Sequence, residues 1–145
     1  MGLAACGHPR YLKLLIQVDR LLEWFLAIRA IIQFMLEKQG ARTAIERWGT
    51  DAVRRARAFV PVDLILLDLM FPDGVSGFDI FDELRREQDL LPIPIVAVSA
   101  MDPSVAVPTT RAKGFDSFIG KPLDAERFPD QVARILRGEP VWETP

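Results

Sequence analysis

Three short apolar runs constrain the fold of this chain more than any other feature. They are Leu12 to Val18, Val62 to Leu67 and Ile93 to Val98, and the third is apolar on both of its faces. Strands of this kind belong in a parallel sheet that helices cover on each side. Because helical patterns separate the runs, the sequence predicts a doubly wound α/β domain with a five-stranded parallel sheet.

The remaining elements follow from periodicity and from capping residues. In chain order we expect a strand over 12–18, a helix over 21–39, a weak strand over 41–47, a helix over 51–58, a strand over 62–67, a helix over 77–86, a strand over 93–98, a short strand over 115–119 and a helix over 124–137. Residues 102–113 contain Pro103 and Pro108, and an interior proline costs a helix ~3 kcal/mol. A loop or a shortened helix is therefore expected there.

Length and composition limit the domain organisation and the location. A chain of 145 residues is expected to form one domain, assigned here to 11–138, with an N-terminal extension over 1–10 and a tail over 139–145. The only cysteine is Cys6, which excludes an internal disulfide and suits a reducing cytoplasm.

Charge and hydropathy argue against two classes of partner. The net charge of −2 gives no reason to expect a nucleic acid. The most apolar window, Leu21 to Leu36, includes Glu23 and Arg29, so a buried helix explains it better than a membrane span. The N-terminus lacks the features of a signal peptide. We therefore expect a cytoplasmic protein without a membrane or nucleic-acid partner.

Polar side chains follow four of the predicted strands. Asp19 follows the first strand, Asp68 the third, Ser99 closes the fourth and Lys121 follows the fifth. Taken singly, each is more often a cap, a turn residue or a solvated surface residue. In a doubly wound sheet, however, the carboxyl ends of the strands form the ligand crevice. Together the four residues form a candidate site.

Three stretches carry a family resemblance: DLILLDLMFPDGVSGFD, PIVAVSAMD and GFDSFIGKPLD. They resemble the receiver domain of bacterial two-component response regulators, over about 11–138. The family pattern has an Asp closing the third strand, a Ser or Thr closing the fourth, and a Lys-Pro pair after the fifth. Asp68, Ser99 and Lys121-Pro122 match it. The resemblance implies the flavodoxin-like receiver fold.

The resemblance also implies the chemistry of the site. Asp68 would be the phosphoacceptor for a histidine kinase or a phosphotransfer protein. Mg²⁺ would be held by Asp68, Asp19 and the backbone carbonyl of Met70, since this ion prefers oxygen ligands. Lys121 would pair with the phosphoryl oxygens as a point charge.

Ser99 and Phe118 would form the switch that the family uses. The hydroxyl moves to the phosphoryl group, and the aromatic ring moves inward into the vacated space. The output would be a contact with another protein or a phosphate relay, without an attached output domain. Such a chain takes part in its own phosphorylation but is no classical enzyme.

The chain departs from the family pattern after the first strand. The family has two adjacent acids there, whereas this chain has Val18, then Asp19 and Arg20. We expect weak Mg²⁺ binding, and two alternatives stay open: Glu23 supplies the missing acid, or Arg20 pairs with phosphate in place of the metal. A pseudo-receiver, which binds proteins without efficient phosphorylation, is the second hypothesis. A small flavodoxin-like enzyme or nucleotide binder is a third, which the absence of a glycine-rich phosphate loop disfavours.

The first helix predicts a subunit contact. Eight apolar residues form its core stripe: Leu21, Trp24, Phe25, Ile28, Ile31, Ile32, Met35 and Leu36. Leu22, Leu26 and Phe34 lie off that stripe. With Trp142 in the tail, they predict an exposed apolar patch and a homodimer.

Overall fold

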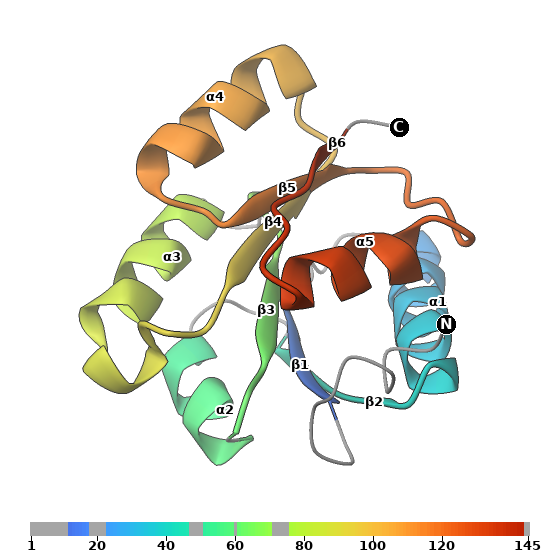
Figure 1. The fold of residues 1–145 in the computed structure, drawn as a ribbon, viewed down its shortest axis with the longest axis horizontal. Coiled ribbons are helices and arrows are strands. Elements are labelled where there is room, and N and C mark those ends of the chain that lie inside the picture. Colours follow the sequence, from blue (N-terminus) through green and yellow to red (C-terminus); the bar gives the residue numbers. More distant parts are fainter. Residues whose placement is uncertain (1–11, 18–22, 47–50, 60, 71–75, 144–145) are drawn as a thin grey trace.

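The computed structural model describes residues 12–17, 23–46, 51–59, 61–70 and 76–143, with side chains from residue 30 onward except 45 and 46. Figure 1 shows a twisted sheet with helices on both faces. None of the helices in these ranges is long and apolar enough to cross a membrane.

In the described part of the chain, six parallel strands form the sheet, in the order β2-β1-β3-β4-β5-β6. Their bounds are β1 (Leu12–Gln17), β2 (Ala41–Glu46), β3 (Leu64–Leu67), β4 (Ile95–Ser99), β5 (Ser117–Gly120) and β6 (Trp142–Glu143). The five expected strands are confirmed. The sixth corrects the predicted strand number, because it lies inside the segment that the sequence assigned to a tail.

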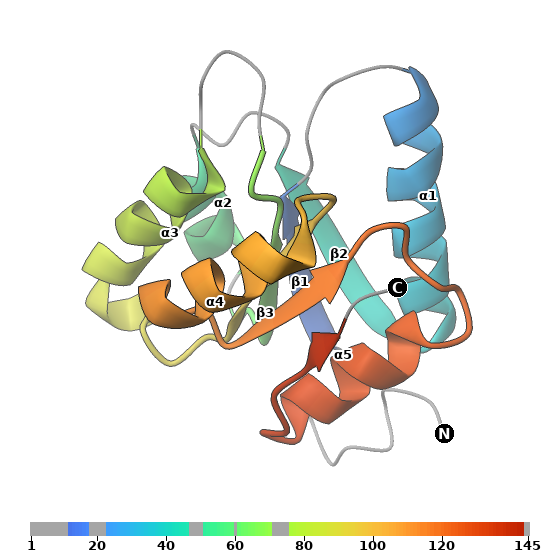
Figure 2. The same cartoon turned by 90° about the horizontal axis from the view of Figure 1, so that it is seen from above.

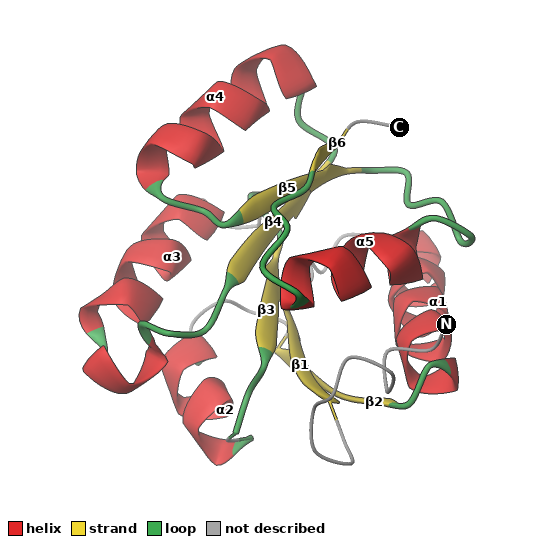
Figure 3. Ribbon diagram, viewed as in Figure 1, coloured by secondary structure: helices red, strands yellow, loops and turns green. Residues whose placement is uncertain are grey.

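Helices alternate with the strands, as Figure 3 shows. They are α1 (Glu23–Lys38), α2 (Ala52–Ala58), α3 (Gly77–Arg86), the 3-10 turn η3 (Gln88–Leu90), α4 (Pro103–Lys113) and α5 (Phe128–Leu136). Helices α1 and α5 cover one face of the sheet, while α2, α3 and α4 cover the other (Figure 2). The doubly wound architecture is confirmed.

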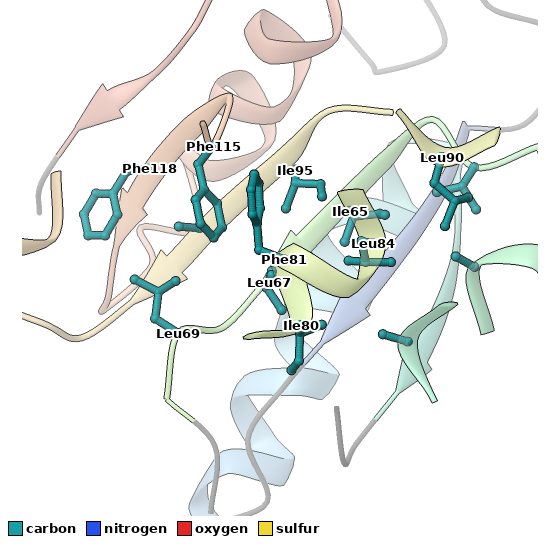
Figure 4. Packing of buried hydrophobic residues seen from close by; sticks show 14 of the residues in the cluster. Ile65, Leu67, Leu69, Ile80, Phe81, Leu84, Leu90, Ile95, Phe115 and Phe118 are labelled. Carbon is teal, nitrogen blue, oxygen red and sulfur yellow. The ribbon is translucent and has the colours of Figure 1, made fainter. Parts of the chain in front are cut away.

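Alternation along β3 explains why both faces had to be apolar. Leu64 and Leu66 belong to the core under α1 and α5, whereas Ile65 and Leu67 belong to the core under α2, α3 and α4. All four side chains are almost completely buried. Figure 4 shows part of the second core, with Phe118 toward one end of the labelled group and Leu90 toward the other.

Helix α4 forms over Pro103–Lys113 despite its two prolines, so the expectation of a loop or a shortened helix is wrong. Pro103 occupies the first turn, where no amide hydrogen is needed, and Asp102 caps it by accepting a hydrogen bond from the Ser104 amide (2.9 Å). Pro108 lies inside the helix and leaves the Ser104 carbonyl without its usual donor. Both residues are exposed, so water can satisfy that carbonyl.

Among the described side chains of α1, which begin at residue 30, one differs from the prediction. Ile32, Met35 and Leu36 are buried, but Ile31, expected on the same stripe, is 50% exposed. Ile31 lies at the edge of the stripe, about 100° around the helix from Ile32. Phe34 is 67% exposed, as expected. Leu22 lies outside the described residues, and so does the side chain of Leu26.

Candidate functional site

Asp68 follows β3 directly, and its carboxylate is held on both oxygens. The residue is 5% exposed. Its Oδ1 accepts a hydrogen bond from the Met70 backbone amide (3.1 Å), and its Oδ2 lies 2.5 Å from Lys121 Nζ. The two side chains are separated by 53 positions in the sequence and brought together by the sheet. A buried carboxylate with an ammonium partner therefore lies at the carboxyl edge of β3.

Lys121 reaches this position from the end of β5. Its backbone amide donates to the Ser99 carbonyl (2.9 Å), which ties the ends of β4 and β5 together. Its side chain is 12% exposed and that of Asp68 is 6% exposed. Removing either member of such a buried pair leaves an uncompensated charge. The peptide bond from Lys121 to Pro122 is cis.

Ser99 and Phe118 lie on the neighbouring strands β4 and β5. Ser99 closes β4 and is fully buried, and its Oγ accepts a hydrogen bond from the Met101 amide (3.2 Å). Phe118 lies in β5, opposite Ala97 in the strand register, and is also fully buried. In this conformation the hydroxyl is engaged with its own loop, and the aromatic ring is inside the core.

The loop after β4 carries a second ordered acid. Asp102 accepts hydrogen bonds from the hydroxyl and the amide of Ser104 (2.6 and 2.9 Å). These bonds lower the pKa of Asp102, with the Ser104 hydroxyl as the largest cause. A carboxylate at this position suits the N-terminus of α4.

Gly77 is a site residue that the sequence interpretation missed. A Cβ at this position would lie 2.1 Å from the Asp68 carbonyl oxygen and 2.6 Å from the Leu69 Cα. The Gly77 amide donates to the Leu69 carbonyl (3.0 Å), and Met70 bridges to Ser76. The first turn of α3 thus lies directly against the backbone that positions Asp68. A glycine immediately after the Ser76 cap was the available signal.

The predicted site residues that follow β1 lie outside the described side chains. Val18, Asp19 and Arg20 lie outside the described residues, and Glu23 begins α1 without a described side chain. Within the described part of the chain, no group of three or more His, Cys, Asp or Glu residues could hold a metal ion. Those residues offer only the Asp68 carboxylate and, by its place in the loop, the Met70 carbonyl. The oxygen donors suit Mg²⁺ in kind, but the set needs a further acid.

Comparison with known proteins gives a consistent family. The model of the family described as "Response regulator receiver domain" matches residues 26–133. The transcriptional regulatory protein AfsQ1 of Streptomyces coelicolor is 32% identical over 111 residues, which cover 77% of this chain and 47% of AfsQ1. The chain thus spans about half the length of that relative.

Two further proteins give fuller coverage. The polar-differentiation response regulator DivK of Brucella ovis is 32% identical over 102 residues, covering 70% of this chain and 81% of DivK. Among solved structures, the receiver domain of the sensor histidine kinase PA1611 from Pseudomonas aeruginosa PAO1 aligns with a TM-score of 0.70 and 23% identity. That alignment covers 88% of this chain and 96% of the solved one, which has a magnesium ion in its active-site cleft.

Proposed function

Since the chain belongs to the response regulator receiver domain family, we propose that Asp68 accepts a phosphoryl group and that the phosphorylated chain signals by binding another protein. The donor is a sensor histidine kinase or a phosphotransfer protein. The observation that carries the proposal is the buried contact of 2.5 Å between Asp68 Oδ2 and Lys121 Nζ. This contact lies at the edge of the sheet where this fold binds its ligands.

The nucleophile is an ordinary carboxylate, so phosphoryl transfer depends on how that carboxylate is positioned and on how the phosphoryl charge is neutralised. An Asp68 oxygen attacks the phosphorus of a phosphohistidine, the P–N bond breaks, and an acyl phosphate forms while the imidazole leaves. Lys121 compensates the negative charge of the carboxylate before transfer and that of the phosphoryl oxygens after it. Because β3 and the packed start of α3 hold the backbone of Asp68, the nucleophile stays in position.

Mg²⁺ would be held by Asp68, Asp19 and the Met70 carbonyl. When bound, it would neutralise part of the phosphoryl charge. Val18 replaces an acid that the family places next to this site, so we propose that the ion binds weakly. Glu23 as a substitute ligand, and Arg20 as a substitute for the metal, remain the two alternatives.

Ser99 and Phe118 are proposed to report the state of Asp68. The Ser99 oxygen now accepts a hydrogen bond from the Met101 amide, and on phosphorylation the hydroxyl reorients to donate to a phosphoryl oxygen. That reorientation changes the space beside Phe118. The resulting change at the surface is what a partner would recognise.

A pseudo-receiver is the second candidate function, and Val18 is the observation that favours it. Such a chain would bind its partner without efficient phosphorylation. We propose a cytoplasmic location for either candidate, with a protein partner and no nucleic acid.

A homodimer through Phe34 is also proposed, because this side chain is 67% exposed. Trp142 no longer supports the dimer, since it lies in β6 and packs against the core.

Incubation with acetyl phosphate and Mg²⁺, followed by intact-mass spectrometry, tests the proposal. We expect one added phosphoryl group that hydroxylamine removes. Asp68→Asn should abolish it, while the matched control Asp63→Asn, at the opposite end of β3, should keep it. If Asp68→Asn is still modified, the assignment of the acceptor is wrong. If the native chain takes up no phosphoryl group while the Val18→Asp variant does, the pseudo-receiver hypothesis is correct.

A further inference from the structure

The C-terminal clasp, defined as Val141, Trp142 and Glu143, adds a sixth strand to the open edge of β5. In the register Phe118 lies opposite Trp142, and Ile119 opposite Glu143. The Phe118 amide donates to the Val141 carbonyl (2.8 Å), and the Val141 amide donates to Ser117 Oγ (3.0 Å). Val141 is 1% exposed. The clasp is therefore an integral part of the sheet, and it pairs with Phe118 itself.

Side chains of the clasp bind α4 and α5, the helices on either side of β5. The Arg111 guanidinium of α4 lies 4.4 Å from the centroid of the Trp142 ring, within the range of a cation–π contact. On the other side, Glu143 accepts hydrogen bonds from Gln131 (2.8 Å) and Arg134 (2.8 Å) of α5, and from Arg127 (3.0 Å). The clasp thus joins α4, β5 and α5.

Trp142 lies on the open side of Phe118. Residues that are opposite each other on adjacent parallel strands point to the same face of the sheet. Ala97, Phe118 and Trp142 form such a row across β4, β5 and β6, with Trp142 at the edge. Trp142 packs against the core that contains Phe118, and Phe118 is 0% exposed. A ring that leaves the core toward this edge would have to displace Trp142.

We propose that Trp142 is a positioning residue, which holds Phe118 in its buried position even when Asp68 carries no phosphoryl group. The clasp as a whole closes the edge of β5 to any partner strand. The role of Trp142 toward Phe118 does not depend on phosphorylation. Only the link to Asp68 rests on the proposed function. The sixth strand of the chain therefore holds Phe118, the proposed switch residue, in its buried position.

The test places 4-fluorophenylalanine at position 118 and records its fluorine NMR signal in H2O and D2O without a phosphodonor. In the native chain we expect one signal with a small solvent isotope shift, as for a buried ring. Trp142→Ala should give a second signal with a larger isotope shift, and Trp142→Phe should restore the single signal. A folded Trp142→Ala chain with the native signal alone would overturn the proposal.

A second variant keeps the test decisive if Trp142→Ala fails to fold. Glu143→Gln weakens the attachment to α5 while the indole remains, so it should give the exposed signal in a smaller amount. Glu126→Gln, which changes an exposed carboxylate shortly before α5, is the matched control and should match the native chain. An unchanged signal in Glu143→Gln would then count against the clasp.

Acetyl phosphate and Mg²⁺ test the link to Asp68 separately, with the extent of phosphorylation read by intact mass. In the variant that shows two signals, phosphorylation should convert the exposed signal into the buried one. Two signals that persist in a chain shown to be phosphorylated would refute the link. A chain that gains no phosphoryl group would refute the proposed function, while the first measurement would still decide the role of Trp142.

Discussion

Gly77→Ala should destabilise the chain and disturb Asp68, although alanine is the better helix former. The new Cβ would lie 2.1 Å from the Asp68 carbonyl oxygen, and contacts below 3.0 Å are essentially never seen. The start of α3 and the end of β3 must then separate by about 1 Å, since both opposing groups are backbone and cannot rotate away.

The size of the effect follows from the contacts that this separation would strain. Overpacking of a tight contact costs about 1–3 kcal/mol. Weakening the hydrogen bond from the Gly77 amide to the Leu69 carbonyl adds about 0.5–1.5 kcal/mol. Helix propensity returns at most about 1 kcal/mol. We expect the free energy of unfolding to fall by about 1–3 kcal/mol.

Urea denaturation, monitored by circular dichroism, measures this loss. With a slope of roughly 2 kcal/mol per molar, the midpoint should fall by about 0.5–1.5 M. Gly138→Ala is the matched control, because φ is 83° there and nothing lies within 4 Å of the added carbon. Gly138→Ala should lower the free energy of unfolding by about 1–2 kcal/mol through backbone strain alone, without a steric contact. It should leave phosphorylation unchanged. A Gly77→Ala chain as stable as the native one would refute the steric argument.

Three further predictions concern separate parts of the fold. Lys121→Met should lower the free energy of unfolding at pH 7 by about 3 kcal/mol, because a buried carboxylate loses its ammonium partner. Urea denaturation monitored by circular dichroism measures this loss, and a variant as stable as the native chain would contradict it. Pro108→Ala should raise the melting temperature, since an interior proline costs a helix ~3 kcal/mol. Pro103→Ala, in the first turn, should change the melting temperature little. Equal effects of the two substitutions would contradict the reasoning. The pKa of Glu143 lies below its ordinary value of 4.5, chiefly through hydrogen bonds from α5. The stability that the ionised Glu143 contributes is therefore present above that value and is lost as pH falls through the lowered pKa. Glu143→Gln should flatten this part of the acid unfolding curve, and an unchanged curve would argue against the contact.

The sequence predicted the architecture because strand burial leaves a local pattern. Ile65 and Leu66 face opposite cores, so both had to be apolar, and this pattern is visible in the sequence alone. Asp68 and Lys121 could be paired as candidates because parallel strands end at the same edge. Their contact of 2.5 Å, by contrast, depends on the register of the sheet.

Features that depend on distant contacts were not predicted. Helix α4 is stabilised by its cap at Asp102 and by the burial of Ala106 and Thr110, which outweigh the penalty of Pro108. Strand β6 has only two residues and no periodicity, and its stability comes from α4, β5 and α5. Gly77 is needed because the first turn of α3 packs directly against the backbone of Asp68 and Leu69, a tertiary contact that periodicity does not report. The role of Val18 stays a prediction.

The central claim is that Asp68 is the phosphoacceptor, and reductive trapping tests it most directly. The native chain is phosphorylated by acetyl phosphate with Mg²⁺ and then treated with borohydride, which reduces an aspartyl phosphate to homoserine. Peptide sequencing by mass spectrometry locates the altered residue. We predict homoserine at position 68 and at no other aspartate, and none in Lys121→Met under conditions where the native chain is partly modified. Homoserine at another aspartate, with Asp68 intact, would contradict the account.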